Sequence, residues 1–107
     1  MENEDNYKMT NINFLKGKSI NSIEIEEDKI IFEYEEHEKD FYASGEYRIN
    51  YNNMSKLEEI INPLELIMKS PITYIDEYMT EENYSKFLFL KIKTEKGFCL
   101  FKRKIFY

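Results

Sequence analysis

Hydrophobic and polar positions alternate most regularly near the C-terminus, over residues 85–106. Aromatic and β-branched residues fill two runs, and Glu95-Lys96-Gly97 is the only break between them, which predicts two strands joined by a tight turn. Because side chains alternate along a strand, a short turn puts the lysines of both arms on one face. These lysines are Lys91, Lys93, Lys102 and Lys104. The other, core-facing side is then formed by Leu88, Leu90, Ile92, Cys99, Phe101 and Ile105.

Alternation also predicts strands in the first half of the chain. Isoleucines alternate with polar residues over residues 22–26, and a second strand follows over residues 29–35. Residues 41–43 and 47–51 are rich in tyrosine, and residues 44–46, with a central glycine, predict a turn between them. The first half of the chain is therefore expected to form two hairpins.

A helix is predicted after these hairpins. Ser55 and Glu58 match the S-x-x-E capping box, in which each side chain satisfies a free backbone N–H at a helix start. Apolar residues then recur at helical spacing, namely Leu57, Ile60, Ile61, Leu64, Ile67 and Met68. Pro63 is expected to break this helix into two short pieces. A strand over residues 72–78 and an acidic loop over residues 80–84 complete the predicted elements.

In chain order these elements are four strands, a helical insert and three strands. We therefore expect an α+β fold, with a mainly antiparallel sheet of about six to seven strands and one short, Pro-broken helix packed on it. A chain of 107 residues has enough apolar surface for one core, so a single domain is expected over residues 14–107. Residues 1–13 are polar and without a sustained period, which predicts a flexible leader.

Composition and charge narrow the class of protein. The net charge of -6 favours solubility and argues against nucleic-acid binding over the whole surface. The single cysteine, Cys99, excludes an intramolecular disulfide framework and fits a reducing cytoplasm. No stretch approaches the ~20 apolar residues that span a bilayer, and the first residues are acidic, unlike a signal peptide. A cytoplasmic protein without a membrane partner is expected.

Charge is unevenly distributed along the chain. Residues 24–46 contain ten acidic and two basic residues, a net -8, whereas residues 86–104 contain seven basic and one acidic, a net +6. The molecule is electrically bipolar unless strands of the two segments are neighbours. In that second case, cross-strand Glu–Lys pairs would cancel much of the asymmetry.

No residue pattern predicts catalysis. His37 is the only histidine, so it lacks the second histidine or the cysteine that most transition-metal sites use. Cys99 lies on a predicted core face, where a free cysteine usually acts as a small hydrophobe, and no second histidine is present to activate it. Paired carboxylates arise from strand alternation alone, and no glycine-rich phosphate loop occurs. We expect a non-enzymatic protein without a metal or cofactor.

Two charged surfaces are candidate binding sites. The acidic surface is a carboxylate array suited to a basic groove, with apolar anchors beside it. It consists of Glu24, Glu26, Ile31, Glu33, Glu35, Glu36 and Tyr42. The basic face of Lys91, Lys93, Lys102 and Lys104 lies beside Phe87, Phe89 and Phe98, residue types that contact phosphates and stack on bases. For both surfaces, an ordinary solvated sheet face is the alternative, and lysines also protect sheet edges from aggregation.

Several short motifs resemble a known family. Leu15-x-Gly17-Lys18-x-Ile20, then Ser22-Ile23-Glu24 and Asp28-Lys29-Ile30-Ile31-Phe32, are similar to the opening of small phage and bacterial proteins of undetermined function. Leu64-Glu65-x-Ile67-x-x-Ser70-Pro71-Ile72 and Thr94-x-Lys96-Gly97 follow in the same order, so the resemblance spans most of residues 15–104. The family's His-x-x-Asp-Cys-Cys-like stretch is replaced here by Tyr42-Ala43-Ser44-Gly45-Glu46-Tyr47. The resemblance implies a mobile-element origin and an antiparallel α+β outline, with no site residue carried over.

Together these observations favour a small inhibitor or adaptor encoded by a phage or mobile element. It would bind a host defence protein through the acidic surface and block that protein's basic nucleic-acid-binding groove, as anti-CRISPR proteins do. Two alternatives stay open at this point: a nucleic-acid-binding module that uses the basic C-terminal hairpin, and a homodimer with a structural role.

Overall fold

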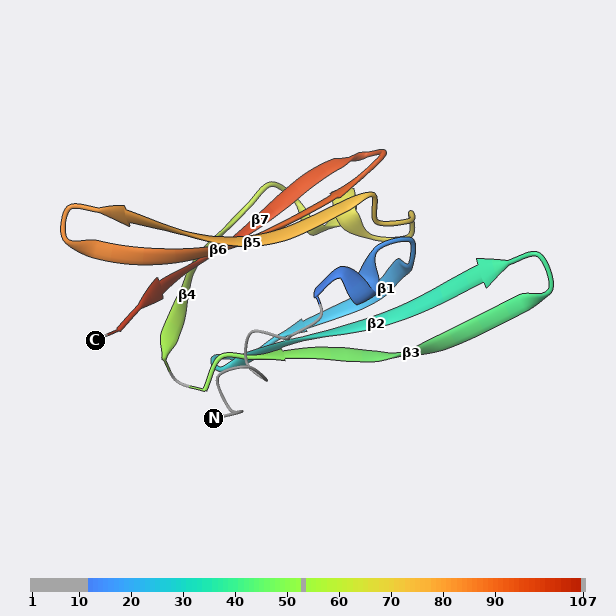
Figure 1. Cartoon of the computed structure of the whole chain (residues 1–107), viewed down its shortest axis with the longest axis horizontal. Helices are drawn as coiled ribbons and strands as arrows, with labels where there is room; N and C mark the ends of the chain where they lie inside the picture. Colours follow the sequence, from blue (N-terminus) through green and yellow to red (C-terminus); the bar gives the residue numbers. More distant parts are fainter. Residues whose placement is uncertain (1–11, 53, 107) are drawn as a thin grey trace.

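The computed structural model describes residues 12–52 and 54–106, which form two antiparallel sheets (Figure 1). One sheet has the order β1-β2-β3, built from β1 (Ser19–Ile25), β2 (Lys29–Glu38) and β3 (Phe41–Asn50). The other has the order β4-β7-β6-β5, built from β4 (Ser55–Ile61), β5 (Tyr74–Glu82), β6 (Ser85–Thr94) and β7 (Gly97–Ile105). Two short 3-10 helices, η1 (Ile12–Leu15) and η2 (Leu64–Ile67), precede β1 and β5.

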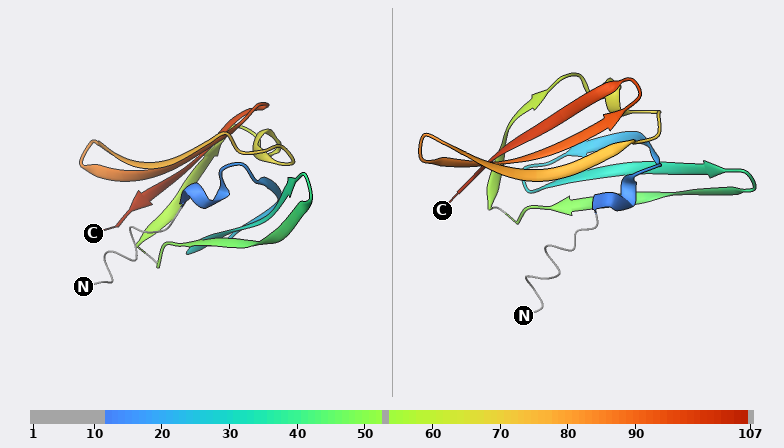
Figure 2. Two further views of the ribbon diagram at one scale, coloured as in Figure 1. Left: turned by 45° about the vertical axis from the view of Figure 1, so that its right-hand side comes forward. Right: turned by 45° about the horizontal axis from the view of Figure 1, so that its top comes forward.

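The core lies between the two sheets, which Figure 2 shows as two layers. Ile20, Ile30, Phe32 and Ile49 come from the three-stranded sheet, and Ile75, Leu90, Ile92, Cys99 and Phe101 come from the four-stranded sheet. Burying these faces against each other removes apolar area from water, the main term that stabilises the fold. In each sheet the remaining face, here called its outer face, points away from the other sheet.

The expected α+β class is wrong, because the described residues are nearly all β. Both helices have only four residues, and residues 55–61 form strand β4 where a helix was predicted. A β-bulge explains the misleading spacing. The register of β4 against β7 shifts between Leu57 and Glu59, so Leu57 and Ile60 both face the core although they are three residues apart. Ser55 begins β4 and so caps no helix. Its hydroxyl instead accepts a hydrogen bond from Arg103.

The predicted hairpin around Gly45 is also wrong. β3 runs without a break through residues 41–50, and Gly45 lies opposite Tyr34 of β2. A Cβ atom at Gly45 would lie 2.7 Å from the Tyr34 hydroxyl oxygen, so the glycine makes room for this ring. The glycine therefore reflects a close cross-strand contact, not a turn.

The remaining elements follow the sequence more closely. The strands predicted over residues 22–26, 29–35 and 85–106 are present, and a two-residue turn joins β6 to β7 as expected. Strand β5 continues to Glu82, through most of the predicted acidic loop. Of the predicted leader, residues 1–11 lie outside the described residues, and Ile12 and Asn13 belong to η1. Across residues 12–52 and 54–106, no helix is long and apolar enough to cross a membrane.

Candidate functional site

The outer face of the four-stranded sheet combines lysines with aromatic rings. In the register of β6 against β7, Phe87 lies opposite Lys104 and Phe89 opposite Lys102. Residues that lie opposite each other share a face, so the four lysines of the predicted basic face lie together, as the alternation predicted. The members of this face from β6 and β7 are Phe87, Phe89, Lys91, Lys93, Phe98, Leu100, Lys102 and Lys104.

Strand β5 extends this face with two tyrosines. Tyr74 lies opposite Lys93, and Tyr78 lies opposite Phe89. The rings of Tyr78 and Phe89 are stacked, with centroids 5.3 Å apart. Both tyrosines are exposed. We call the set of Tyr74, Tyr78, Phe87, Phe89, Lys91, Lys93, Phe98, Lys102 and Lys104 the aromatic–lysine surface.

The lysines of this surface contact rings, not carboxylates. Lys102 Nζ lies 4.3 Å from the centroid of Phe87, and Lys91 Nζ lies 5.1 Å from that of Phe98. Asp76 and Glu59 lie opposite Lys91 and Lys102 in the register. Even so, within residues 12–52 and 54–106 none of the four ammonium groups lies within salt-bridge distance of a carboxylate. Their positive charge is therefore not neutralised by ion pairing in this part of the chain.

Three residues of this face were missed by sequence reasoning. Lys56 lies opposite Lys104 and adds a fifth lysine at the β4 side. Its segment was predicted to be helical, which concealed the strand alternation. Tyr74 and Tyr78 belong to the strand predicted over residues 72–78, in which they alternate in step with Ile72, but Ile72 is buried before β5 begins. The signal that could have found them is Ile75, an apolar residue of opposite parity that faces the core.

The one arginine of the C-terminal hairpin does not contribute to this surface. Arg103 faces inward with 1% of its surface exposed. Its Nε donates to Ser55 Oγ at 2.8 Å, and its Nη2 donates to the carbonyl oxygen of Glu27 at 2.6 Å. Burial lowers the pKa of this guanidinium, while the nearby Asp28 and Glu77 oppose that shift. Arg103 therefore joins β7 and β4 to the β1–β2 turn beneath the surface.

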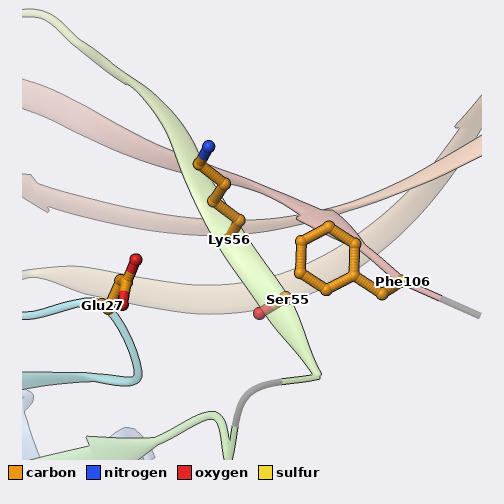
Figure 3. Close-up of a pocket in the computed structure, with 4 residues that line it drawn as sticks. All are labelled: Glu27, Ser55, Lys56 and Phe106. Atoms are coloured by element: carbon orange, nitrogen blue, oxygen red, sulfur yellow. The ribbon is translucent and has the colours of Figure 1, made fainter.

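Small cavities flank this buried arginine. Glu27, Ser55, Lys56 and Phe106 line a cavity of about 220 Å³ (Figure 3). A second cavity of about 290 Å³ is mainly apolar and lies between the β3–β4 connection and the ends of β5, β6 and β7. It is lined by Tyr51, Met54, Ser55, Met79, Lys86, Leu88 and Ile105. Both are smaller than the ~300–1,000 Å³ typical of small-molecule sites. In neither lining do an acidic and a basic side chain of the described residues form an ion pair.

The predicted acidic surface is only partly assembled. Glu24, Glu33, Glu35 and Tyr42 lie on the outer face of the three-stranded sheet. Glu26 directly follows β1, and its hydrogen bond and its charge raise the pKa of Glu24. These carboxylates therefore repel one another on an exposed face.

Two residues of the acidic surface are placed differently from the prediction. Ile31, expected as an exposed anchor, is 6% exposed because it lies between Glu24 of β1 and Arg48 of β3. Glu36 has the parity of the inner face, where its carboxylate lies 3.8 Å from Lys18 Nζ. Tyr42 is exposed as predicted.

The two charged surfaces belong to different sheets. The acidic residues occupy the outer face of β1-β2-β3, and the lysines occupy the outer face of β4-β7-β6-β5. Cross-strand pairing between the two segments does not occur among the described strands. Of the two possibilities that the sequence left open, the structure shows the bipolar one.

Within the described part of the chain, neither His37 nor Cys99 belongs to a cluster of potential metal ligands. His37 is exposed on β2, and its Nε2 lies 2.8 Å from Glu35 Oε1, which lowers the pKa of that carboxyl. Cys99 is buried on the core face as predicted, and burial raises its pKa to about 11. In the described ranges, no three His, Cys, Asp or Glu side chains are grouped to hold a metal ion.

Comparison of the chain with protein-family models, with curated proteins and with solved structures found no match. The resemblance of residues 15–104 to small phage proteins stays a prediction.

Proposed function

We propose that this protein binds single-stranded nucleic acid on the aromatic–lysine surface. The observation that carries the proposal is the interleaving of unneutralised lysines with aromatic rings over β5, β6 and β7. Lysines supply the phosphate contacts that dominate affinity for nucleic acids. Aromatic side chains supply stacking platforms for bases, and each stacked base contributes about 1–3 kcal/mol.

The lysine–ring contacts are weak enough to be replaced by contacts with a bound nucleic acid. A cation–ring contact at an exposed site contributes only ~0.5–1 kcal/mol. When a strand binds, Lys102 can move from Phe87 toward a phosphate, and a base can then stack on the ring. In the free protein these contacts position the lysine side chains, and phosphates and bases can replace them when a strand binds.

Several features favour single strands over duplexes. The surface is the face of a sheet, which offers ring faces and edges to unstacked bases. In a duplex those base faces are covered by neighbouring pairs. The acidic residues on the opposite sheet repel phosphates, so the bound strand is confined to one side of the molecule.

The test is fluorescence anisotropy with labelled oligothymidylate and oligouridylate at low salt. We expect both to bind the wild-type protein, and we expect the triple variant Lys91→Gln, Lys93→Gln, Lys102→Gln to lose at least about tenfold in affinity. The matched control is Lys16→Gln, Lys39→Gln, Lys69→Gln, which changes net charge equally at exposed positions away from this surface. Absence of binding by the wild-type protein, or an equal loss in the control, would rule the proposal out.

A second candidate is a partner protein that docks on the acidic surface. It is favoured by the exposed Phe41 and Tyr42, which lie opposite Glu38 and His37 near the end of the β2–β3 hairpin. The partner would carry a basic groove, as in the inhibitor hypothesis. Reversal of Glu24, Glu33 and Glu35 to lysine should abolish capture of such a partner from a nuclease-treated host lysate, with the fold retained. Unchanged capture would remove the acidic surface from consideration.

A further inference from the structure

The turn between β5 and β6 is unusual in its second residue. Glu82 pairs with Ser85, so Asn83 and Tyr84 form a two-residue loop. Both have positive φ angles, 48° at Asn83 and 68° at Tyr84. Two-residue hairpin loops of this kind strongly prefer Asn or Asp followed by Gly. Asn83 fits this preference, whereas Tyr84 occupies the position where glycine is expected.

Among the described residues, no interaction of Tyr84 offsets the strain of this backbone conformation. A bulky residue with positive φ is strained, because its Cβ crowds the backbone. The side chain of Tyr84 is 98% exposed. It makes no hydrogen bond, ring contact or cation contact with the residues that the structure describes. A strained and wholly exposed aromatic residue is a feature that stability alone does not explain.

The position of Tyr84 relates it to the aromatic–lysine surface. The β5–β6 turn projects beyond the three-stranded sheet at the left-hand end of Figure 1. Phe87, the first ring of β6 on that surface, follows only three residues later, a span of about 10 Å along a strand. Glu82 and Ser85, which close the turn, have the parity of the same outer face. Tyr84 therefore stands at one end of the row of rings.

We infer that Tyr84 stacks on a base at the end of the bound strand and so extends the site by one stacking position. The inference rests on the proposed function. Base stacking would also give the strained turn a role. The left-handed conformation leaves the Tyr84 ring almost fully exposed, so a base can reach it. Stacking by tyrosine does not depend on base identity, so the site is expected to tolerate different sequences.

The experiment compares Tyr84→Gly with the wild-type protein in two measurements. Glycine relieves the backbone strain, so thermal unfolding followed by circular dichroism should show Tm raised by about 4 °C or more. Loss of the ring should weaken binding of labelled oligothymidylate by about tenfold. A variant that is more stable yet binds less well cannot owe its defect to misfolding.

Two further variants make the result specific. Tyr84→Phe keeps the ring and should bind within about twofold of the wild-type protein, because stacking does not need the hydroxyl. Met79→Ala removes an exposed apolar side chain of β5 that lies outside the aromatic–lysine surface and should also leave binding unchanged. A loss in Tyr84→Phe as large as in Tyr84→Gly would overturn stacking as the mechanism.

The outcomes separate this inference from the proposed function. If the lysine triple variant loses binding but Tyr84→Gly does not, only the role of Tyr84 is overturned. If the wild-type protein binds neither oligonucleotide, both ideas are overturned together. A lower Tm for Tyr84→Gly would contradict the strain in the turn.

Discussion

The guanidinium carbon of Arg103 lies 4.0 Å from the centre of the Tyr51 ring. Tyr51 directly follows β3 of one sheet and Arg103 lies in β7 of the other, so this cation–π contact spans the two layers. The same guanidinium donates to Ser55 and to the Glu27 carbonyl oxygen. A charged side chain in this position is costly to bury unless it is bonded, so its partners should matter for stability.

Removal of this side chain should destabilise the protein strongly. We expect Arg103→Ala to lower the free energy of unfolding by about 3 kcal/mol, because it leaves a cavity and unsatisfied oxygens at Ser55 and Glu27. Urea denaturation followed by circular dichroism measures this change. Lys102→Ala, on the exposed side of the same strand, is the control and should stay within ~0.5 kcal/mol of the wild-type protein. Equal effects of the two substitutions would contradict the role of Arg103.

Binding of nucleic acid should depend on salt in proportion to the lysines involved. Each phosphate contact with a single strand adds about 0.7 to the slope of log K against log salt concentration. The variant that lacks Lys91, Lys93 and Lys102 should therefore show a slope smaller by roughly 2. Anisotropy titrations between low and moderate salt measure both slopes. An unchanged slope would mean that these lysines do not contact phosphates.

Cys99 should make stability depend on alkaline pH. Its pKa is raised from 9.0 to about 11 by burial, so between these values the unfolded chain loses a proton that the folded protein keeps. The contribution of the protonated Cys99 thiol to the free energy of unfolding is therefore fully present below pH 9. It is lost as pH rises toward 11, by roughly 2–3 kcal/mol in total. Urea denaturation at pH 8 and pH 10.5 should show a smaller fall for Cys99→Ala than for the wild-type protein. Parallel pH profiles would contradict this assignment.

Gly45 should resist substitution because of Tyr34. Gly45→Ala places a methyl group 2.7 Å from the Tyr34 hydroxyl oxygen and 3.0 Å from the ring carbon that carries it, and should cost about 1–3 kcal/mol. The cost should largely disappear in a Tyr34→Leu background, which a double-mutant cycle of unfolding free energies measures. If the two substitutions are additive, the ring does not set the requirement for glycine.

Strand alternation was reliable where strands are regular. It placed the four lysines on one face and Cys99, Phe101 and Leu90 on the other, because β6 and β7 pair without a bulge. It also placed Glu24, Glu33 and Glu35 on the outer face of the other sheet, although not Glu36. It could not place Ile31, since burial on an outer face depends on neighbours in adjacent strands, such as Arg48 of β3.

The missed features have a common physical origin. A β-bulge in β4 produces the three-residue spacing of Leu57 and Ile60 that otherwise indicates a helix, and a bulge in β1 gives Ile20 and Ile23 the same spacing. Gly45 resembles a turn residue because the ring that covers it belongs to another strand. The role of Arg103 depends on a contact with Glu27, far away in the sequence. Local pattern does not contain these tertiary contacts.

The strand order β4-β7-β6-β5 has a consequence for biosynthesis. Strand β4 leaves the ribosome before η2, β5 and β6, yet its partner β7 is made after all of them. Synthesis proceeds at ~5–20 residues per second, so the N–H and C=O groups of β4 that pair with β7 stay unpaired on the order of seconds. The β1-β2-β3 sheet, in contrast, can pair as each strand appears. Holdase chaperones that recognise nascent chains should therefore associate longest with residues 55–61.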